Sequence, residues 1–149
     1  MLWMEGDIYV IPPKCGITSL IRANDVLRVS SLNDRPYNKI ILVTRSPQDR
    51  LVSAWRNKWP DLTWEEFADM VLDTPDENVD IHLRPQSWFL GGVVPDEVRT
   101  IASVAEHKPR NRIPWLNRSD SELFTVGTYR KDEILAYYAE DGILFNQRR

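Results

Sequence analysis

The sequence predicts an α/β fold, arranged as a single three-layer domain with a central parallel sheet. Two apolar segments, residues 8–11 and 39–44, have the composition of buried strands. Each is followed by a polar loop and then by a segment with helical features. Strand–loop–helix units in series are typical of parallel sheets that are covered by helices. A chain of 149 residues suits one core, so we expect one domain over residues 1–149.

The first half of the chain supplies two such units. Residues 8–11, IYVI, form the first predicted strand, and a helix is predicted from residue 18 to about residue 30, with imperfect apolar spacing. The second strand, KIILVT at 39–44, has the strongest strand signal, because a continuous apolar run suits a central parallel strand. We predict the following helix over residues 48–59, where Pro60 ends it.

The second half is less regular. Thr63 and Glu66 fit a capping box, which predicts the start of a further helix. Residues 97–104, EVRTIASV, have features of both a strand and a helix, and both alternatives stay open. A final helix is predicted over residues 131–140, with Gly142 as its C-cap.

Composition excludes several classes of protein. The net charge of −3 fits neither a nucleic-acid coat nor a membrane-surface protein. No apolar run is long enough to cross a bilayer, and Glu5 and Asp7 interrupt the N-terminus too early for a signal peptide, so we expect a cytoplasmic protein without a membrane partner. With Cys15 as the single cysteine and no Cys/His cluster, we expect neither a disulfide nor a metal.

Positive charge is concentrated in one segment. Residues 14–58 contain nine Lys or Arg and three Asp, a local net charge of +6 (9 − 3), which leaves −9 for the rest of the chain. Such a segment could serve a small anionic ligand, or its charges could face solvent independently.

The loop PPKCGITSL, residues 12–20, has the chemistry of an anion site. Lys14 supplies a positive charge, and Gly16 lets the backbone approach a ligand closely. The backbone N–H groups at the start of the helix can bind phosphate, and Thr18 and Ser19 can either cap the helix or donate to phosphate oxygens. The Walker A order is absent, because this lysine precedes the glycine. The alternative is an ordinary capped turn.

A second loop, at the end of the next strand, repeats this chemistry. Arg45 follows the central strand, where open α/β sheets bind ligands, and Ser53 lies on the helix that follows. An arginine fork and a hydroxyl can hold one phosphate. Arg50 could contact phosphate or brace the loop by pairing with an acid, and we favour the brace. Two such loops predict a ligand with two separated anionic groups.

These segments resemble the sulfotransferase family. PKCGITSL is similar to the family's 5′-phosphosulfate loop, P-K-x-G-T-T-S-L, and RSPQDRLVS is similar to its 3′-phosphate motif, R-x-P-x-x-R-x-x-S. VDIHLRPQ, IPWLNRS and YYAEDGILF resemble segments of the Golgi carbohydrate sulfotransferases of the chondroitin type. Ile17 replaces a usual hydroxyl residue and Leu83 a usual tryptophan.

The resemblance implies a minimal, P-loop-like sulfotransferase fold. The implied reaction moves a sulfuryl group from 3′-phosphoadenosine 5′-phosphosulfate (PAPS) to a hydroxyl acceptor, with a carbohydrate as the expected acceptor and 3′,5′-adenosine bisphosphate (PAP) as product. Lys14 would stabilise the leaving phosphate oxygen, and His82, whose reference pKa lies near neutrality, is the candidate base. The residues implied to bind the donor are Lys14, Cys15, Gly16, Ile17, Thr18, Ser19, Arg45, Ser53, Asn117 and Ser119.

Two alternatives remain open at this point. The chain could be a non-catalytic nucleotide-binding relative that retains only the donor pocket. It could also be a P-loop-type kinase, which the missing Walker A order disfavours. His82 itself could have only a structural role in its loop.

Overall fold

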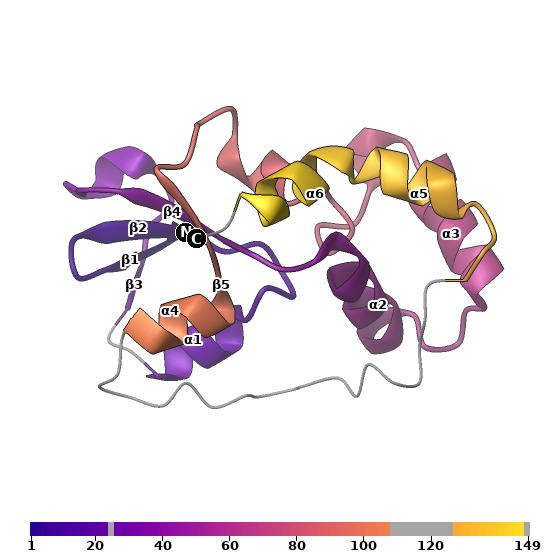
Figure 1. Ribbon diagram of the computed structural model, residues 1–149, viewed down its shortest axis with the longest axis horizontal. Helices are drawn as coiled ribbons and strands as arrows, with labels where there is room; N and C mark the ends of the chain where they lie inside the picture. The colour runs from indigo at the N-terminus through magenta and orange to yellow at the C-terminus, as the bar shows by residue number, and fades with distance from the viewer. Residues whose placement is uncertain (24–25, 108–126, 148–149) are drawn as a thin grey trace.

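The computed structural model describes residues 1–23, 26–107 and 127–147, and it has the α/β architecture that the sequence predicts (Figure 1). Five strands form one sheet in the order β3-β1-β2-β4-β5. The strands are β1 (Leu2–Met4), β2 (Asp7–Val10), β3 (Leu27–Arg28), β4 (Ile40–Thr44) and β5 (Glu97–Thr100). The helices are α1 (Ile17–Ala23), α2 (Pro47–Lys58), α3 (Trp64–Asp73), α4 (Ile101–His107), α5 (Lys131–Tyr137) and α6 (Ala139–Asn146), with shorter 3₁₀ turns at η1 (Leu32–Asp34), η2 (Asp76–Asn78) and η3 (Ser87–Leu90).

The sheet is mixed rather than wholly parallel. Strands β2, β4 and β5 are parallel, as predicted, whereas β1 runs antiparallel to both β2 and β3. The reason is the turn at Glu5 and Gly6, which have φ values of 51° and 91°. Two consecutive residues with positive φ match the tight hairpin turn that joins antiparallel strands, while parallel strands need a long crossover.

Several helix predictions are confirmed. Helix α2 begins one residue before the predicted start, with Ser46 as its N-cap and Pro47 in its first turn, and it ends at Lys58. The predicted capping box of α3 is present, with reciprocal hydrogen bonds between Thr63 and Glu66. Residues 97–104 contain both of the alternatives that their sequence left open, because β5 ends at Thr100 and α4 begins at Ile101.

Two predicted helices are wrong in extent. The helix predicted to reach residue 30 ends at Ala23, and residues 27–28 instead pair with β1, which the isolated segment cannot reveal. The final helix is two helices that meet at Tyr138, where the backbone leaves helical geometry and the side chain is buried. Because α6 continues to Asn146, Gly142 lies within a helix and is not a C-cap.

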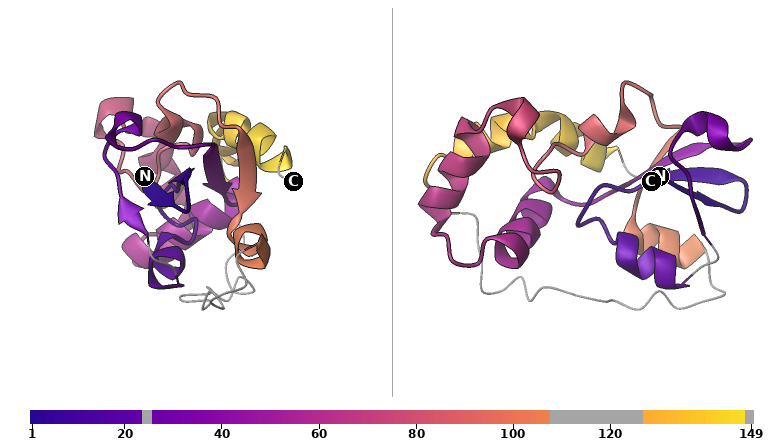
Figure 2. Two further views of the ribbon diagram at one scale, coloured as in Figure 1. Left: turned by 90° about the vertical axis from the view of Figure 1, so that its left-hand side faces the viewer. Right: turned by 180° about the vertical axis from the view of Figure 1, so that it is seen from behind.

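The sheet is covered on both faces. Alternate residues along β4 point to opposite sides, so Ile41 and Val43 face one layer while Ile40 and Leu42 face the other. Helices α1 and α4 lie side by side against the first face, as both views of Figure 2 show. Leu90 of η3 and Leu144 of α6 pack against the second face.

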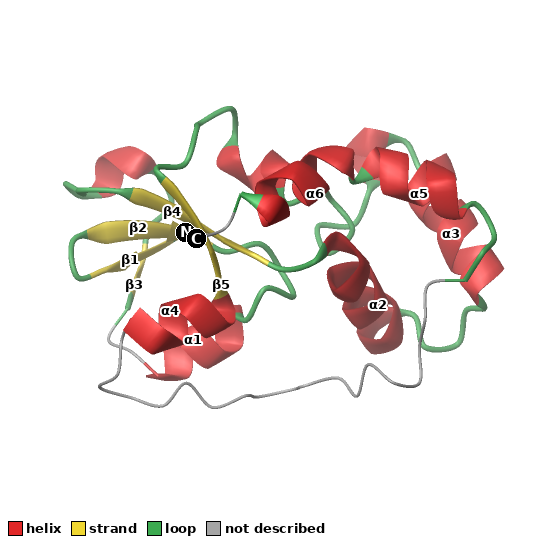
Figure 3. Cartoon of the chain, in the orientation of Figure 1, coloured by secondary structure: helices red, strands yellow, loops and turns green. Residues whose placement is uncertain are grey.

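A second apolar core lies beyond the carboxyl end of β4. Helices α2, α3 and α5 meet there (Figure 3). Trp55 stacks on Phe67 with ring centroids 5.6 Å apart, and Trp64 packs edge-on to Trp55. This packing holds α2 in the helical core, and other side chains of α2 contact the loop that follows β2. That the whole chain folds as one domain stays a prediction.

Candidate active site

The two predicted anion-binding loops lie at the same edge of the sheet. Strands β2 and β4 are direct parallel neighbours, with Val10 opposite Leu42. Their carboxyl ends therefore meet, and the loops at residues 11–16 and 45–46 leave the sheet side by side. This is the edge at which open α/β sheets bind ligands.

The first loop has an unusual backbone. Lys14 and Gly16 both have positive φ, at 70° and 94°. A Cβ atom on Gly16 would lie 2.7 Å from Ile101 Cγ1, so only glycine fits there. Cys15 N donates to Pro12 O, which closes the turn.

Helix α1 begins at Ile17, directly after this turn. Thr18 and Ser19 therefore lie inside the helix, so neither acts as its cap, and the Thr18 side chain is exposed. Ile17 packs against the sheet core, which leaves only its backbone for a ligand. With seven residues, α1 is a short helix with a small dipole. Side-chain cations must therefore supply most of the positive charge that would attract an anion to this loop.

One face of α2 holds the first loop in place. Arg50, Ser53 and Asn57 share this face by helical spacing. Arg50 Nε donates to Pro13 O at 3.0 Å, and Lys14 Nζ donates to Asn57 Oδ1. Arg50 is 2% exposed. Arg50 therefore braces the loop by binding a backbone carbonyl, and not by pairing with an acid as predicted. Its Nη2 is buried without a hydrogen-bond partner among the described residues.

The edge of the sheet is strongly cationic. Arg45 Nη1 lies 3.5 Å from Lys14 O, so its guanidinium reaches across to the first loop. Burial lowers the pKa of Lys14, and the nearby positive charges of Lys58 and Arg45 lower it further. Like charges held this close favour the arrival of an anion that neutralises them.

Sequence reasoning missed a buried residue that contacts both loops. Gln86 is fully buried, and its Oε1 accepts hydrogen bonds from Cys15 Sγ, Thr44 Oγ1 and Arg45 N. The buried carboxylate of Asp141, on α6, accepts from Gln86 N at 2.7 Å. Both residues lie in segments that resemble the family, VDIHLRPQ and YYAEDGILF, and this was the only signal that could have identified them.

His82 is oriented by a carboxylate. Its Nδ1 lies 2.7 Å from Asp80 Oδ1, which also accepts from His82 N. Partial burial raises the pKa of Asp80, but these hydrogen bonds outweigh that effect and hold it below its usual range. Lys58 lowers the pKa of both Asp80 and Lys14, so it links this pair electrostatically to the first loop.

The turn that carries His82 is fixed by its neighbour. Leu83, at the position where the resembled segment has tryptophan, is buried in the helical core, and its carbonyl accepts from the Tyr138 hydroxyl. The leucine that replaces the usual tryptophan therefore lies in the helical core. Asn117 and Ser119, which the sequence suggests for nucleotide binding, lie outside the described residues.

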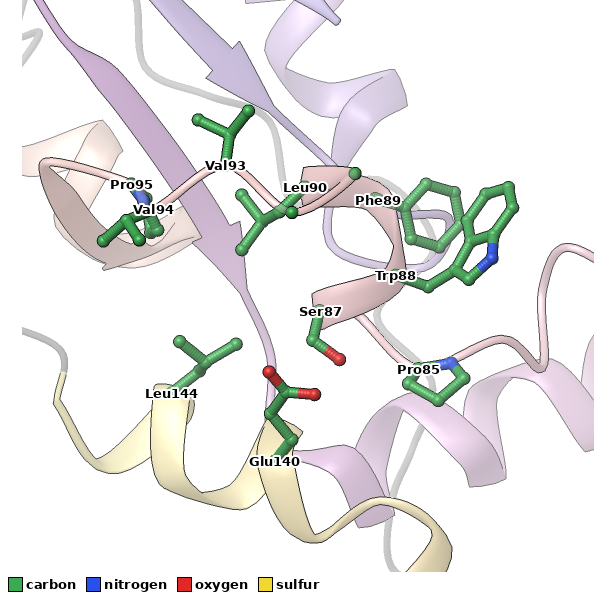
Figure 4. Close-up of a pocket in the computed structure, with 12 residues that line it drawn as sticks. Pro85, Ser87, Trp88, Phe89, Leu90, Val93, Val94, Pro95, Glu140 and Leu144 are labelled. Atoms are coloured by element: carbon green, nitrogen blue, oxygen red, sulfur yellow. The ribbon is translucent and has the colours of Figure 1, made fainter.

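A cavity in the described part of the chain lies away from these residues. A space of about 960 Å³ is lined mainly by apolar side chains of η3, α6 and the segment before β5, with Glu140 at its rim (Figure 4). None of Lys14, Arg45, Ser53 and His82 lines it, and its apolar walls do not suit a phosphate.

The described residues contain neither a metal-binding cluster nor a helix suited to cross a membrane. In residues 1–23, 26–107 and 127–147, no group of three His, Cys, Asp or Glu side chains is placed to hold a metal ion. No helix in the described part of the chain is both long and apolar enough to cross a membrane.

Fold and site together define an α/β protein with a cluster of positive charge at the carboxyl edge of its sheet. A family model described as the sulfotransferase family matches residues 19–108, which is more than half of the chain. The chain therefore belongs to the sulfotransferase family. The matched segment contains Arg45, Ser53 and His82, and it begins at Ser19 in the first turn of α1, so Lys14 and Gly16 precede it. No curated protein and no solved structure matches the chain.

Membership confirms the resemblance at the level of the family. It supports sulfuryl transfer as the general activity, with a small-molecule donor and an acceptor. It also disfavours the kinase alternative.

Proposed function

We propose that this protein transfers a sulfuryl group from PAPS to a hydroxyl acceptor, with a carbohydrate as the acceptor class. One observation carries the proposal: two cationic loops leave neighbouring parallel strands at the same edge, with Arg45 Nη1 3.5 Å from Lys14 O. PAPS carries two separated anionic groups on one nucleoside, so each loop would take one. Family membership supports this choice of donor.

In this proposal the first loop binds the 5′-phosphosulfate. Backbone N–H groups from Gly16 to Ser19 face the phosphate in a P-loop-like arrangement of strand, loop and helix. Cys15 has a supporting role, since its N–H is already donated to Pro12 and its side chain is buried. Arg45 and Ser53 would bind the 3′-phosphate, the first by charge and the second by its hydroxyl.

The proposed reaction is an in-line displacement at sulfur. The acceptor oxygen forms a bond to sulfur as the bond from sulfur to the 5′-phosphate oxygen breaks, which leaves PAP. The Lys14 ammonium stabilises the charge that develops on the leaving oxygen. The acceptor proton passes to His82, whose Nδ1 donates to Asp80, so that Nε2 is the nitrogen free to accept it.

Donor binding can be tested by calorimetric titration with PAP, AMP and ATP. Arg45→Ala should weaken PAP binding by roughly 10–100-fold, the effect of losing a hydrogen bond to a charged group, and should leave AMP binding nearly unchanged because AMP lacks the 3′-phosphate. Arg35→Ala is the matched control, because Arg35 lies over the ring of Trp3 on β1, whereas the two anion-binding loops follow β2 and β4. Equal binding of PAP and ATP, or no effect of Arg45→Ala, would contradict the proposed donor.

The base can be tested by transfer of sulfur-35 from PAPS to a panel of oligosaccharides. His82→Ala should lower kcat by about 10²–10⁴-fold while PAP binding is unchanged. Unaltered transfer in His82→Ala would show that the base assignment is wrong. Tight PAP binding without transfer to any acceptor would favour the non-catalytic alternative.

A further inference from the structure

The side-chain amide of Gln86 hydrogen-bonds to both anion-binding loops. On its oxygen it accepts from Cys15 Sγ at 3.1 Å, in the first loop, and from Arg45 N at 2.9 Å, in the second. Thr44 Oγ1 donates to the same oxygen at 3.0 Å. Every group near Oε1 is a donor, and both groups near Nε2 are acceptors, so the network fixes the orientation of the amide.

Gln86 hydrogen-bonds to both backbone groups of Arg45, the N–H and the C=O. Arg45 N donates to Gln86 Oε1, and Gln86 Nε2 donates to Arg45 O, each at 2.9 Å. The amide thus pairs with Arg45 as a neighbouring strand would, just beyond the end of β4. Because these bonds fix the backbone of Arg45, they set the direction in which its guanidinium leaves the sheet.

The position of Gln86 does not depend on the loops alone. Asp141 on α6 accepts from Gln86 N at 2.7 Å and from Ser87 N at 3.0 Å, and it is itself fully buried. Cys15 is also suited to a permanent hydrogen bond, because burial raises its pKa to about 12 and keeps the thiol protonated as a donor. The amide is therefore a fixed, dry link between the two loops, in addition to the contact of Arg45 Nη1 with Lys14 O.

We infer that Gln86 is a positioning residue that sets the spacing between the two anion-binding loops, and so selects ligands with two phosphates at a matching distance. This inference rests on the proposed function. A ligand that carries two tethered anions gains affinity over either single anion only when both sites can be filled at once, and that gain is lost when the spacing is wrong. Gln86 touches neither phosphate, yet it would determine the preference for a bisphosphate.

The test compares three ligands, PAP, AMP and 3′-AMP, by calorimetry on the full chain. Wild-type protein should prefer PAP over either monophosphate by on the order of 10²-fold. Gln86→Leu, which keeps the volume but removes the amide, should reduce that preference by about tenfold while the dissociation constants of the monophosphates change less than about twofold. Cys15→Ala breaks only the link to the first loop and should have the same effect.

Thr44→Val is the matched control. It removes a hydrogen bond to the same Gln86 oxygen, but Thr44 and Arg45 lie on one strand end, so the link between the loops remains. The preference for PAP should therefore be retained. A loss in Thr44→Val equal to that in Cys15→Ala would overturn the inference.

The outcomes separate this inference from the proposed function. If wild-type protein shows no preference for PAP, the proposed function fails and the inference fails with it. If the preference is present but survives in folded Gln86→Leu and in Cys15→Ala, the donor site stands and the inference is wrong. Equal weakening of all three ligands would indicate general damage and also overturn it. If Gln86→Leu does not fold, Cys15→Ala decides.

Discussion

Among single residues, Cys15 couples the first loop to the interior of the protein. It is 2% exposed, and its thiol donates to Gln86. Burial raises its pKa from 9.0 to about 12. Since the folded state holds the proton to higher pH than the unfolded state, this group stabilises the fold fully below pH 9.0, and that stabilisation is lost as pH rises towards 12.

We therefore predict that the free energy of unfolding of the wild-type protein falls between pH 9 and pH 10, measured by urea denaturation. In Cys15→Ser this dependence should be largely absent, because serine does not titrate there. Tyr9, whose pKa burial raises from 10.0 to about 12, should add its own dependence in both proteins above pH 10. Identical slopes in the two proteins between pH 9 and pH 10 would contradict the prediction.

Position 16 requires glycine for two reasons, its backbone conformation and its contact with Ile101. Gly16→Ala places an L side chain at φ 94° and a Cβ 2.7 Å from Ile101 Cγ1, so we expect a loss of about 1–3 kcal/mol in stability. Gly91→Ala is the control for backbone strain alone, because Gly91 has φ 58° and no atom within 4 Å of its Cβ position. Equal losses of stability at the two glycines, measured by urea denaturation, would show that the contact with Ile101 has no effect.

Among the elements, α3 begins through local chemistry alone. Thr63 Oγ1 accepts from Glu66 N, and Glu66 Oε2 accepts from Thr63 N. The sequence predicts this capping box because the two residues are three apart and need no distant partner.

Thr63→Ala should therefore destabilise the protein by about 1 kcal/mol, seen as a lower urea midpoint with an unchanged slope. Thr63→Ser keeps the hydroxyl and should have a much smaller effect. A full loss in Thr63→Ser would mean that the methyl group, not the cap, stabilises this position.

Helix α2 has two different faces. Leu51, Ala54 and Trp55 pack into the helical core, while Arg50 and Asn57 hold the first loop. The sequence predicts the apolar face from its periodicity. The loop-facing polar groups do not follow from it, because their partners come from another strand end.

In the whole molecule, the candidate site lies where the sheet meets the helical core. The first loop belongs to the sheet, whereas Arg50 and Asn57 belong to a helix packed in the second core. A ligand held between them binds only the folded chain, so it should stabilise the whole fold.

PAP at one hundred times its dissociation constant should raise the free energy of unfolding by about 2.7 kcal/mol, which corresponds to an increase of several degrees in Tm. The same concentration of AMP should raise Tm less. In Arg45→Ala the difference between the two nucleotides should become much smaller, as measured by a thermal unfolding series. An undiminished difference in this variant would place the 3′-phosphate away from Arg45.

The sequence by itself determined the two parallel strands, α2, the α3 capping box and the order of the two loop motifs. Each of these depends on residues that are close together in the chain, namely apolar runs, helix caps and short motifs. That the two strands are direct neighbours, so that the two loops meet at one edge, came from the structure.

Only the tertiary structure decided which groups connect these parts. Gln86 and Cys15 are 71 positions apart, and Lys14 and Asn57 are 43 apart, so no local pattern marks either pair. The same holds for β3, which exists because β1 offers it a partner, and for the break at Tyr138, whose side chain is buried against Leu83. Local chemistry specifies the elements, but a buried hydrogen bond is specified only by the chain that folding brings beside it.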